Sequence, residues 1–247
     1  MPRHISEHPG SGPAPGRRKF LILAGAGVTG LAGAALFGAA WLNPAVGQRM
    51  ARLKDRAAFH IRDRLTPRRS PAELAERLFA PDDALVIGPS GPGLVEFINY
   101  NCAACKFQHR TLTALRQEGA TFRLIVRQKP KPGTTSELAA RAVIAATLQG
   151  VGHRLHGLFM DHPGTLREED ILALAVKAGA ETKRLEADMS GPMAAHWLDN
   201  DADLAWLLRL VHTPSFVTRT EAIEGVIGQE RFYGLLGLPT PEWGFPR

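Results

Sequence analysis

The chain has 247 residues, of which 45% are hydrophobic, and this is enough for one or two domains with a proper core. Its net charge of +6 is uneven, because residues 1–69 hold 12 Lys and Arg against 3 Asp and Glu, whereas residues 70–247 hold 18 against 21. The globular part is therefore slightly acidic, which argues against nucleic-acid binding by that part.

The N-terminal segment has the pattern of an export signal. Residues 1–16 are rich in Pro, Gly and His and should lack a fixed structure. Arg17 and Arg18 then precede an apolar, Ala- and Gly-rich run over 20–42, which resembles a twin-arginine signal. Small residues at 45–47 offer a cleavage site, but a run of this length could also anchor the chain in a bilayer.

A basic linker and a short helix are expected next. The apolar stripe of 48–69 is modest, so a solvated spacer, an interfacial helix and a dimer-forming helix are all open interpretations. Ser70 and Pro71, followed by Glu73, indicate a helix start, and this helix should run to about Phe79. Short strands are then expected over residues 84–87 and 94–98, with a turn rich in Gly and Pro between them.

Cys102 and Cys105 are the only cysteines, and Ala103 and Ala104 separate them. A buried strand that delivers such a pair to a helix start is typical of a thioredoxin-type redox site. The dipole and free N–H groups at a helix start favour a thiolate, so Cys102 is expected to be the nucleophile. Cys105 lies one turn on, close enough to form a disulfide with it and to resolve a mixed disulfide.

Two other interpretations of the cysteine pair are weaker. A structural bridge across two residues closes too small a loop to stabilise a domain much. A structural zinc site needs four ligands, usually from two such pairs, and the chain has one pair.

The remaining elements complete a recognisable order. A helix is expected over 106–118, a strand over 121–127, and an almost wholly helical block over 136–209, in which Thr165 and Glu168 predict a capping box. Strands return at 215–218 and 222–224, before a last helix near 228–236. This order predicts the α/β class, with a thioredoxin fold that carries an inserted helical domain. The expected bounds are 1–47 for the leader with its signal or anchor, 48–80 for the linker and short helix, 81–135 for the first half of the thioredoxin fold, 136–210 for the insertion and 211–247 for the second half.

Thr213 and Pro214 precede the returning strand. Taken alone, a proline just before a strand indicates only where the strand begins. Together with the cysteine pair, it resembles the cis-proline that thioredoxin-like enzymes place beside the disulfide, where the missing N–H keeps the surface open. The residue before it would then offer backbone hydrogen bonds to an extended substrate.

Four short motifs share one resemblance. They are Val95-Glu96-Phe97 with the cysteine pair, the segment 136–142, the loop 213–217, and Glu224-Gly225. In these motifs the segment 94–247 resembles the DsbA family of periplasmic thiol–disulfide oxidoreductases. The resemblance implies a thioredoxin fold with a helical insert, disulfide exchange on exported proteins, and no bound cofactor.

Four residues depart from the family pattern. Ala103 and Ala104 stand where the best-known oxidases have Pro and His, so no imidazolium stabilises the thiolate there. We therefore expect a higher pKa of Cys102, and a weaker oxidant, than in those enzymes. Thr213 resembles the isomerase and reductase branches, and His212 stands where glycine is common. The direction of electron flow stays open between oxidase, isomerase and reductase.

Two further side chains are candidates for the site. Glu96 is a lone carboxylate on a strand that should be buried, and the resemblance implies that it accepts the proton of Cys105 through water. The alternative is that Glu96 faces solvent. His212 is a candidate for tuning the thiolate, because a charged imidazole beside Cys102 would lower its pKa.

The sequence thus predicts an exported thiol–disulfide oxidoreductase, at work in the periplasm or at the outer face of the inner membrane. Its expected partners are exported proteins with cysteines and a membrane or soluble redox partner, with no nucleic acid and no cofactor or metal. The first alternative is a copper-binding metallochaperone that uses both cysteines and a histidine. The second is a non-catalytic protein that presents a peptide groove.

Overall fold

The computed structural model describes residues 65–239, together with Lys54 and Ile61. The chain divides into two compact units, 1–66 and 67–247, and the fold described below is that of the second. The expected leader, the apolar run 20–42 and most of the expected linker lie outside the described residues. Among the residues that are described, no helix has the length and hydrophobicity to cross a bilayer.

A five-stranded mixed sheet forms the centre of the unit. Its spatial order is β1-β3-β2-β4-β5, in which β2 and β3 are parallel and the other neighbours are antiparallel. The strands are β1 Leu85–Ile87, β2 Gly93–Ile98, β3 Arg123–Gln128, β4 Ser215–Val217 and β5 Ala222–Glu224. All five strands predicted from the sequence are present, within two residues at each end.

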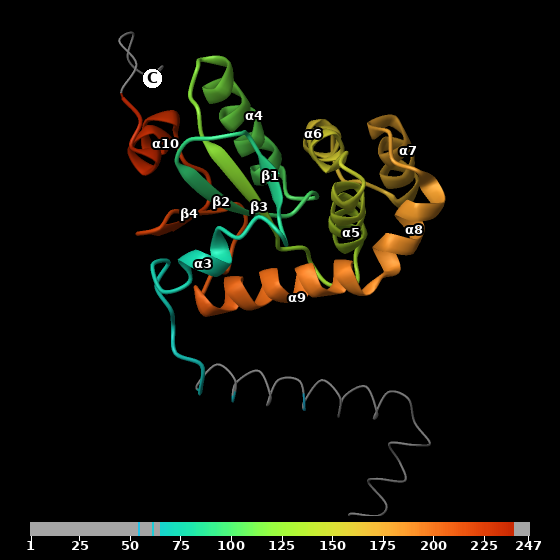
Figure 1. Ribbon diagram of the computed structural model, residues 1–247, viewed down its shortest axis with the longest axis horizontal. Coiled ribbons are helices and arrows are strands. Elements are labelled where there is room, and N and C mark those ends of the chain that lie inside the picture. Colours follow the sequence, from blue (N-terminus) through green and yellow to red (C-terminus); the bar gives the residue numbers. More distant parts are fainter. Residues whose placement is uncertain (1–53, 55–60, 62–64, 240–247) are drawn as a thin grey trace, which may run out of the picture. The chain divides into compact units, whose positions relative to one another are not determined.

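Eight helices are described around and beside the sheet. They are α3 Ala75–Leu78, α4 Ala103–Gln117, α5 Thr135–Leu148, α6 Gly152–Asp161, α7 Glu168–Ala178, α8 Thr182–Ser190, α9 Pro192–Leu207 and α10 Gln229–Leu236. Helices α4 and α10 lie on one side of the sheet and α3 with one end of α9 on the other, while α5 to α8 stand beside it (Figure 1). This is a thioredoxin fold with additional helices between β3 and β4.

The alternation of side chains along β2 separates two hydrophobic cores. Leu94 and Ile98 point into the core beneath α4 and α10, whereas Val95 and Phe97 point into the core against α3 and α9. Glu96 shares the face of Leu94 and Ile98, because side chains two residues apart along a strand point the same way. The predicted buried strand therefore places one carboxyl group on the α4 side of the sheet.

Two sequence interpretations of the helical block need correction. The helix α6 was not expected as a separate element, and a left-handed turn at Gly150, with φ +77°, divides it from α5. The predicted capping box of Thr165 and Glu168 is wrong. Helix α7 begins at Glu168, Arg167 is its N-cap, and the Arg167 N–H donates to Asp170 Oδ2 at 3.0 Å. The register of the helix start is therefore shifted by two residues.

A buried ion-pair cluster ties α9 to the sheet. Arg127 on β3 is fully buried and donates from Nη1 to Asp201 of α9 at 3.1 Å and to Asp83 at 2.8 Å. Its Nη2 donates to the main-chain oxygens of Arg77 and Ala80. Burial raises the pKa of Asp201 to about 7, and the charge of Arg127 opposes that shift.

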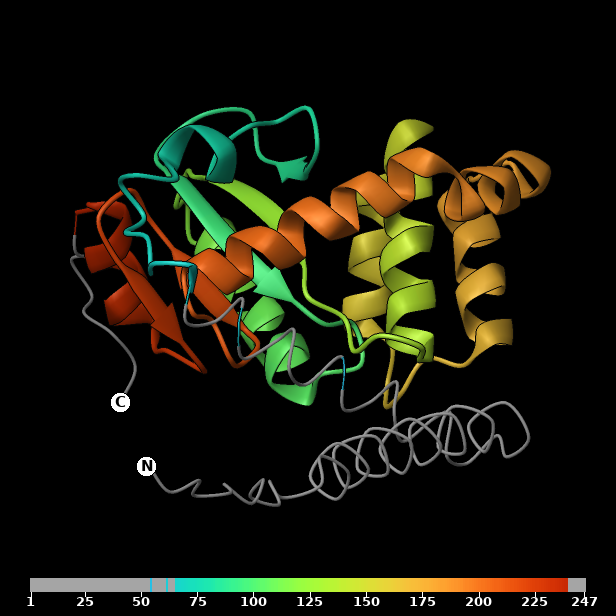
Figure 2. The same ribbon diagram turned by 90° about the horizontal axis from the view of Figure 1, so that it is seen from below.

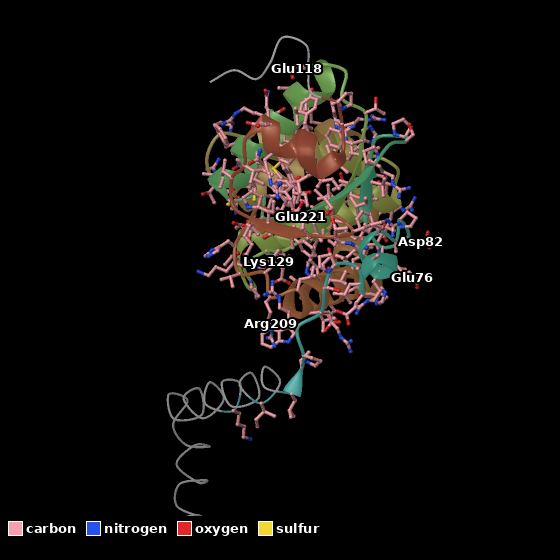
Figure 3. All side chains as sticks on the ribbon, turned by 90° about the vertical axis from the view of Figure 1, so that its left-hand side faces the viewer. Glu76, Asp82, Glu118, Lys129, Arg209 and Glu221 are labelled. Atoms are coloured by element: carbon pink, nitrogen blue, oxygen red, sulfur yellow. The ribbon has the colours of Figure 1, made fainter. Side chains whose placement is uncertain are left out.

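Helix α9 contacts both parts of the unit along its length. Its first turns pack against α5, where Trp197 and Ala194 meet Ile144. Its last turns pack under the sheet, where Leu204 joins the core of Phe97. Figure 2 shows the helix crossing from the helical block to the sheet. Charged side chains such as Glu76, Asp82 and Glu118 lie at the surface of the unit (Figure 3).

Candidate active site

Cys102 lies where β2 passes into α4. Its N–H donates to Asn99 O at 2.9 Å, and with φ −93° and ψ 117° it is the extended N-cap of the helix. The first backbone N–H groups of a helix have no partner within the helix, so they can donate to an acceptor that lies at the helix start. The Cys102 side chain is half-buried, so its sulfur stays within reach of a partner from solvent.

Cys105 lies one turn further on and is fully buried. Both thiols are free in the structure. Cys105 donates a hydrogen bond to Cys102, and this contact together with burial raises the pKa of the Cys105 thiol. One exposed and one buried sulfur give the pair two different chemical environments.

The cis-proline loop reaches the same place from the other end of the chain. The Thr213–Pro214 peptide bond is cis, as predicted, and Pro214 is buried. Cys102 Sγ lies 3.4 Å from Thr213 O, although 111 residues separate them. The fold therefore brings the cysteine pair, Thr213 and Pro214 together.

Glu224 holds this loop in position, a role that was not predicted from the sequence. Its Oε2 accepts hydrogen bonds from Val211 N at 2.7 Å and His212 N at 2.5 Å. The Gly225 N–H donates to Pro214 O at 2.8 Å across the β4–β5 pair. Residues at the end of β5 thus form hydrogen bonds with the main chain on both sides of Thr213.

The electrostatics of the site favour a thiolate at Cys102. The hydrogen bond from Cys105, and further ones from Thr213 and from the backbone N–H groups of Cys105 and Ala104, lower the pKa of Cys102 to about 5. Ala103 is exposed and Ala104 half-exposed, so the two methyl groups add no charge to the site. The low pKa comes from hydrogen bonds at a helix start rather than from a charged side chain.

Glu96 lies in the core beneath this helix. It is 1% exposed, and burial raises the pKa of its carboxyl to about 8. Its Oε1 has no hydrogen-bond partner among the described residues. The charge of Glu96 further raises the pKa of Cys105, so the two groups interact. The alternative that Glu96 faces solvent is wrong.

His212 lies apart from the thiolate. Its side chain is exposed, and within the described region it makes no hydrogen bond or ion pair with Cys102. Its main-chain oxygen accepts from Ser215 Oγ at 2.7 Å, so the residue takes part in the loop through its backbone. Tuning of the thiolate by the His212 imidazole stays a prediction.

Asn101 and Lys106, which the sequence did not single out, join the site to the loop between α6 and α7. Asn101 Oδ1 accepts from Leu166 N at 2.8 Å, and the mostly buried Lys106 donates to His162 O at 2.7 Å and to Gly164 O at 2.5 Å. The loop 162–166 is thereby fixed beside the start of α4.

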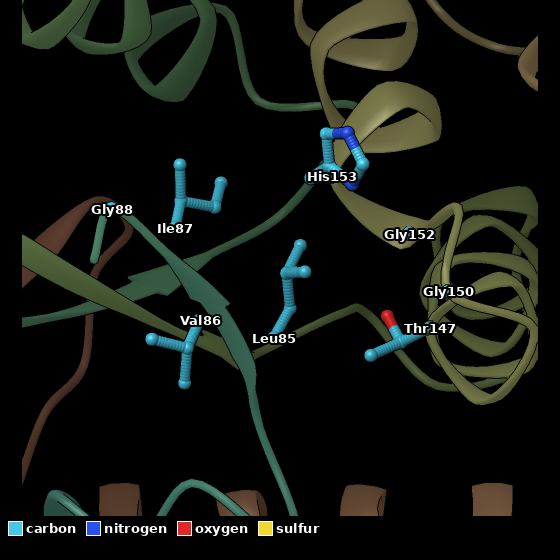
Figure 4. Close-up of a pocket in the computed structure, with 8 residues that line it drawn as sticks. All are labelled: Leu85, Val86, Ile87, Gly88, Thr147, Gly150, Gly152 and His153. Atoms are coloured by element: carbon cyan, nitrogen blue, oxygen red, sulfur yellow. The ribbon is translucent and has the colours of Figure 1, made fainter.

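A metal site at Cys102 and Cys105 would need a third ligand, and the described part of the chain offers none nearby. No three His, Cys, Asp or Glu side chains gather there in a way that could hold an ion. A surface pocket of about 280 Å³ between β1 and the turn from α5 to α6 is lined by Ile87, Thr147 and His153 among others (Figure 4). None of the predicted site residues lines it.

Among solved structures, a thioredoxin-like oxidoreductase from Silicibacter pomeroyi DSS-3 is 31% identical, with a TM-score of 0.62 over 66% of this chain and 95% of that one. The catalytic domain of Proteus mirabilis ScsC is 20% identical, with a TM-score of 0.60 over 67% and 94%. The thiol-disulfide exchange protein α-DsbA2 from Wolbachia pipientis is 18% identical, with a TM-score of 0.61 over 72% and 97%. At 20% and 18% identity, the similarities to the Proteus mirabilis and Wolbachia pipientis proteins show the fold alone.

Among curated proteins, the Na⁺/H⁺ antiporter NhaA 3 of Salinispora tropica is 25% identical over 170 residues. NhaA of Herminiimonas arsenicoxydans is 26% identical over 133 residues. These matches take in 62% and 53% of this chain but 26% and 21% of the antiporters, so the chain spans about a quarter of the curated relatives that it matches. No family model matches the chain.

Proposed function

This chain belongs to the DsbA-type family of thioredoxin-fold thiol–disulfide oxidoreductases, and from that membership we propose that it exchanges disulfides with cysteine-containing proteins outside the cytoplasm. One observation carries the proposal. A half-exposed sulfur at a helix start, Cys102, lies 3.4 Å from the carbonyl oxygen of Thr213, which precedes a cis-proline. A substrate cysteine that reaches Cys102 would find the main chain of that loop available for pairing.

In the oxidising direction, a substrate thiolate attacks Cys102 Sγ of the enzyme disulfide, and Cys105 leaves with the electron pair and takes a proton. A second substrate thiolate then attacks the substrate sulfur of the mixed disulfide. A substrate disulfide forms and Cys102 leaves as a thiolate, so two electrons pass to the enzyme. A thiol of low pKa leaves readily, and the pKa of Cys102 near 5 supports this direction.

Glu96 supports the chemistry of Cys105. The raised pKa of this buried thiol makes its proton hard to remove, and its carboxyl neighbour has a pKa of about 8, near the operating range of a general base. In the proposed mechanism Glu96 takes the Cys105 proton when Cys105 resolves a mixed disulfide, and supplies a proton when Cys105 is released.

The proposed location rests on two observations of different kinds. A structural neighbour is described as a periplasmic thioredoxin-like protein from Salmonella enterica serovar Typhimurium, and Arg17 and Arg18 precede the apolar run 20–42. Replacing Arg17 and Arg18 together by lysine should retain the full chain inside the cell. Fractionation that finds the variant outside the cytoplasm would argue against a twin-arginine route.

The function is tested by following disulfide exchange with a reduced, cysteine-containing protein and with glutathione buffers. Cys102→Ser should abolish turnover, and Cys105→Ser should accumulate a mixed disulfide. The pKa of Cys102 lies between the thioredoxin value of about 7 and the DsbA value of about 3.5. We therefore expect a potential between about −270 and −120 mV. Turnover that survives in Cys102→Ser would contradict the proposal.

A further inference from the structure

A pair of buried polar side chains lies beside the core of the redox site. Tyr100 is fully buried just before the cysteine motif, and His156 on α6 is 1% exposed. The Tyr100 hydroxyl lies 3.1 Å from His156 Nδ1, and the rings pack edge to face. Neither residue is among the site residues predicted from the sequence.

The inner end of this pair interacts electrostatically with the groups that handle the Cys105 proton. Tyr100 belongs to the same hydrophobic core as Cys105, on the face of the sheet that carries Glu96. Burial and the charges of Glu96 and Cys105 raise the pKa of Tyr100, whereas a hydrogen bond with the Gln128 side chain lowers it. Tyr100 therefore stays a neutral hydroxyl that can donate one proton while it accepts another.

The outer end leads towards the surface between α4 and α6. His156 Nε2 is buried and has no hydrogen-bond partner in the described part of the chain. The nearest ring is that of His109 on α4, with a centroid distance of 5.1 Å. His109 is only partly buried, and Asp161, at the end of α6, is exposed. The two helices lie side by side in Figure 1.

Burial lowers the pKa of both histidines more than the surrounding charges do. Burial, and then His109, lower the pKa of His156 to about 3. Burial also lowers the pKa of His109, with Arg110 and Arg116 acting in the same direction and Asp161 in the opposite one. A neutral ring at His156 has one protonated nitrogen and one acceptor nitrogen, which is what a transfer through the ring requires.

We propose that Tyr100, His156 and His109 form a proton relay that connects Glu96 and Cys105 with solvent between α4 and α6. The proposal rests on the proposed function, since it concerns the proton that Cys105 loses or gains in disulfide exchange. A buried acid that accepts a proton once per turnover needs a route for returning it, and this row of neutral polar groups leads from the core to a partly exposed histidine.

The step balances as follows when a mixed disulfide is resolved. The Cys105 proton passes to Glu96, and the Cys105 sulfur attacks Cys102 Sγ. The enzyme disulfide forms, the mixed S–S bond breaks, and the substrate leaves as a thiolate with the electron pair. Glu96 then returns to its ionised form by giving its proton to the Tyr100 oxygen. Tyr100 passes its own proton to His156 Nδ1, and the Nε2 proton goes to His109 and on to solvent. The transfers at His156 are concerted, because burial disfavours an imidazolium there.

The experiment uses the full chain with a glutathione mixed disulfide on Cys102, and it measures glutathione release by Cys105 in stopped flow. Tyr100→Phe keeps the ring without the hydroxyl, and His156→Gln keeps a hydrogen-bonding side chain that cannot pass a proton through. We expect each to slow release about 100-fold at neutral pH, at the low end of the effects of a positioned proton-transfer group. His153→Gln, an exposed position on the same helix, is the matched control and should release at the wild-type rate.

Two further readouts separate a relay from a structural role. The redox potential and the pKa of Cys102 should stay at their wild-type values, and added imidazole should restore the rate of His109→Ala at the partly exposed end. That variant also keeps the test decisive if the core variants fold poorly. Release at the wild-type rate in His109→Ala and Tyr100→Phe would overturn the relay, as would slowing that follows a changed potential. A wild-type protein that releases no glutathione would instead overturn the proposed function, and the relay with it.

Discussion

Replacing Cys105 should change the acidity of Cys102 more than any other single substitution nearby. The hydrogen bond from the Cys105 thiol is the largest influence that lowers the pKa of Cys102 to about 5. A hydrogen bond to a charged acceptor contributes about 1.5–3 kcal/mol, and one pKa unit corresponds to about 1.4 kcal/mol. Removing the donor would therefore raise the pKa by about 1–2 units. Because Cys102 is half-exposed and solvent screens the site, we expect about 1 unit in Cys105→Ala.

The assay follows the ultraviolet absorbance of the Cys102 thiolate as a function of pH, with the rate of alkylation as a second readout. Cys105→Ser is the matched control, because its hydroxyl can still donate, and it should titrate close to the wild-type protein. Thr213→Val removes a weaker donor and should raise the pKa less than Cys105→Ala does. If Cys105→Ala titrated at the wild-type pKa, the backbone N–H groups of α4 alone would set the acidity and the reasoning would be refuted.

Three other changes test the surroundings of the site. Burial raises the pKa of Glu96 from 4.5 to about 8, so the folded protein holds this proton more tightly than the unfolded chain. The contribution of Glu96 to the free energy of unfolding is complete below pH 4.5 and is lost as the pH rises to about 8, a loss of at most about 5 kcal/mol. Denaturant unfolding at several pH values measures this loss, and Glu96→Gln should lack the dependence. Arg127→Met leaves buried Asp201 without its cation and should lower the free energy of unfolding by about 3–5 kcal/mol. Arg69→Ala, which breaks an exposed pair, should lower it much less, and equal losses would contradict the burial argument. Gly91 has φ +98°, and a Cβ at this position would lie 2.6 Å from Thr121 O, so Gly91→Ala should lower the free energy of unfolding by about 1–3 kcal/mol. Gly119→Ala is the control, because Gly119 has a similar φ of +95° but open space around its Cβ position, and it should destabilise the protein less. Identical melting temperatures for the two variants would count against this contact.

The parts of the fold that the sequence predicts well are those with local signals. The strand β2 is a continuous apolar run, and the cysteine pair marks the start of α4, so both were placed within a few residues. The cis bond before Pro214 followed from the combination of two motifs that are distant in the chain. Helix α6, which the left-handed turn at Gly150 separates from α5, was not predicted as an element of its own.

Long-range polar contacts explain what the sequence could not give. The partners of Arg127 lie 44 and 74 residues away, and no local pattern pairs a strand arginine with one particular aspartate. Glu224 supports the cis-proline loop only because the register of β4 and β5 brings it to Val211. His212 illustrates the converse, since its place in the chain suggested a contact with Cys102 that needs the side chain to turn inward, and the structure leaves that side chain exposed.

The double contact of α9 bears on how this protein could be shortened or recombined. The helix is the last one of the helical block in the chain, yet its C-terminal end supplies Leu204 and Leu208 to the core that packs against α3, and Asp201 to Arg127. Excising the block at its apparent ends in the sequence would uncover part of one face of the sheet and remove one of the two carboxylates that pair with buried Arg127, leaving only Asp83. A graft of this helical block onto another thioredoxin scaffold would have to exchange α9 together with the strand residues beneath it. The sheet and the helical block therefore form one structural unit, although they are separate segments of the chain.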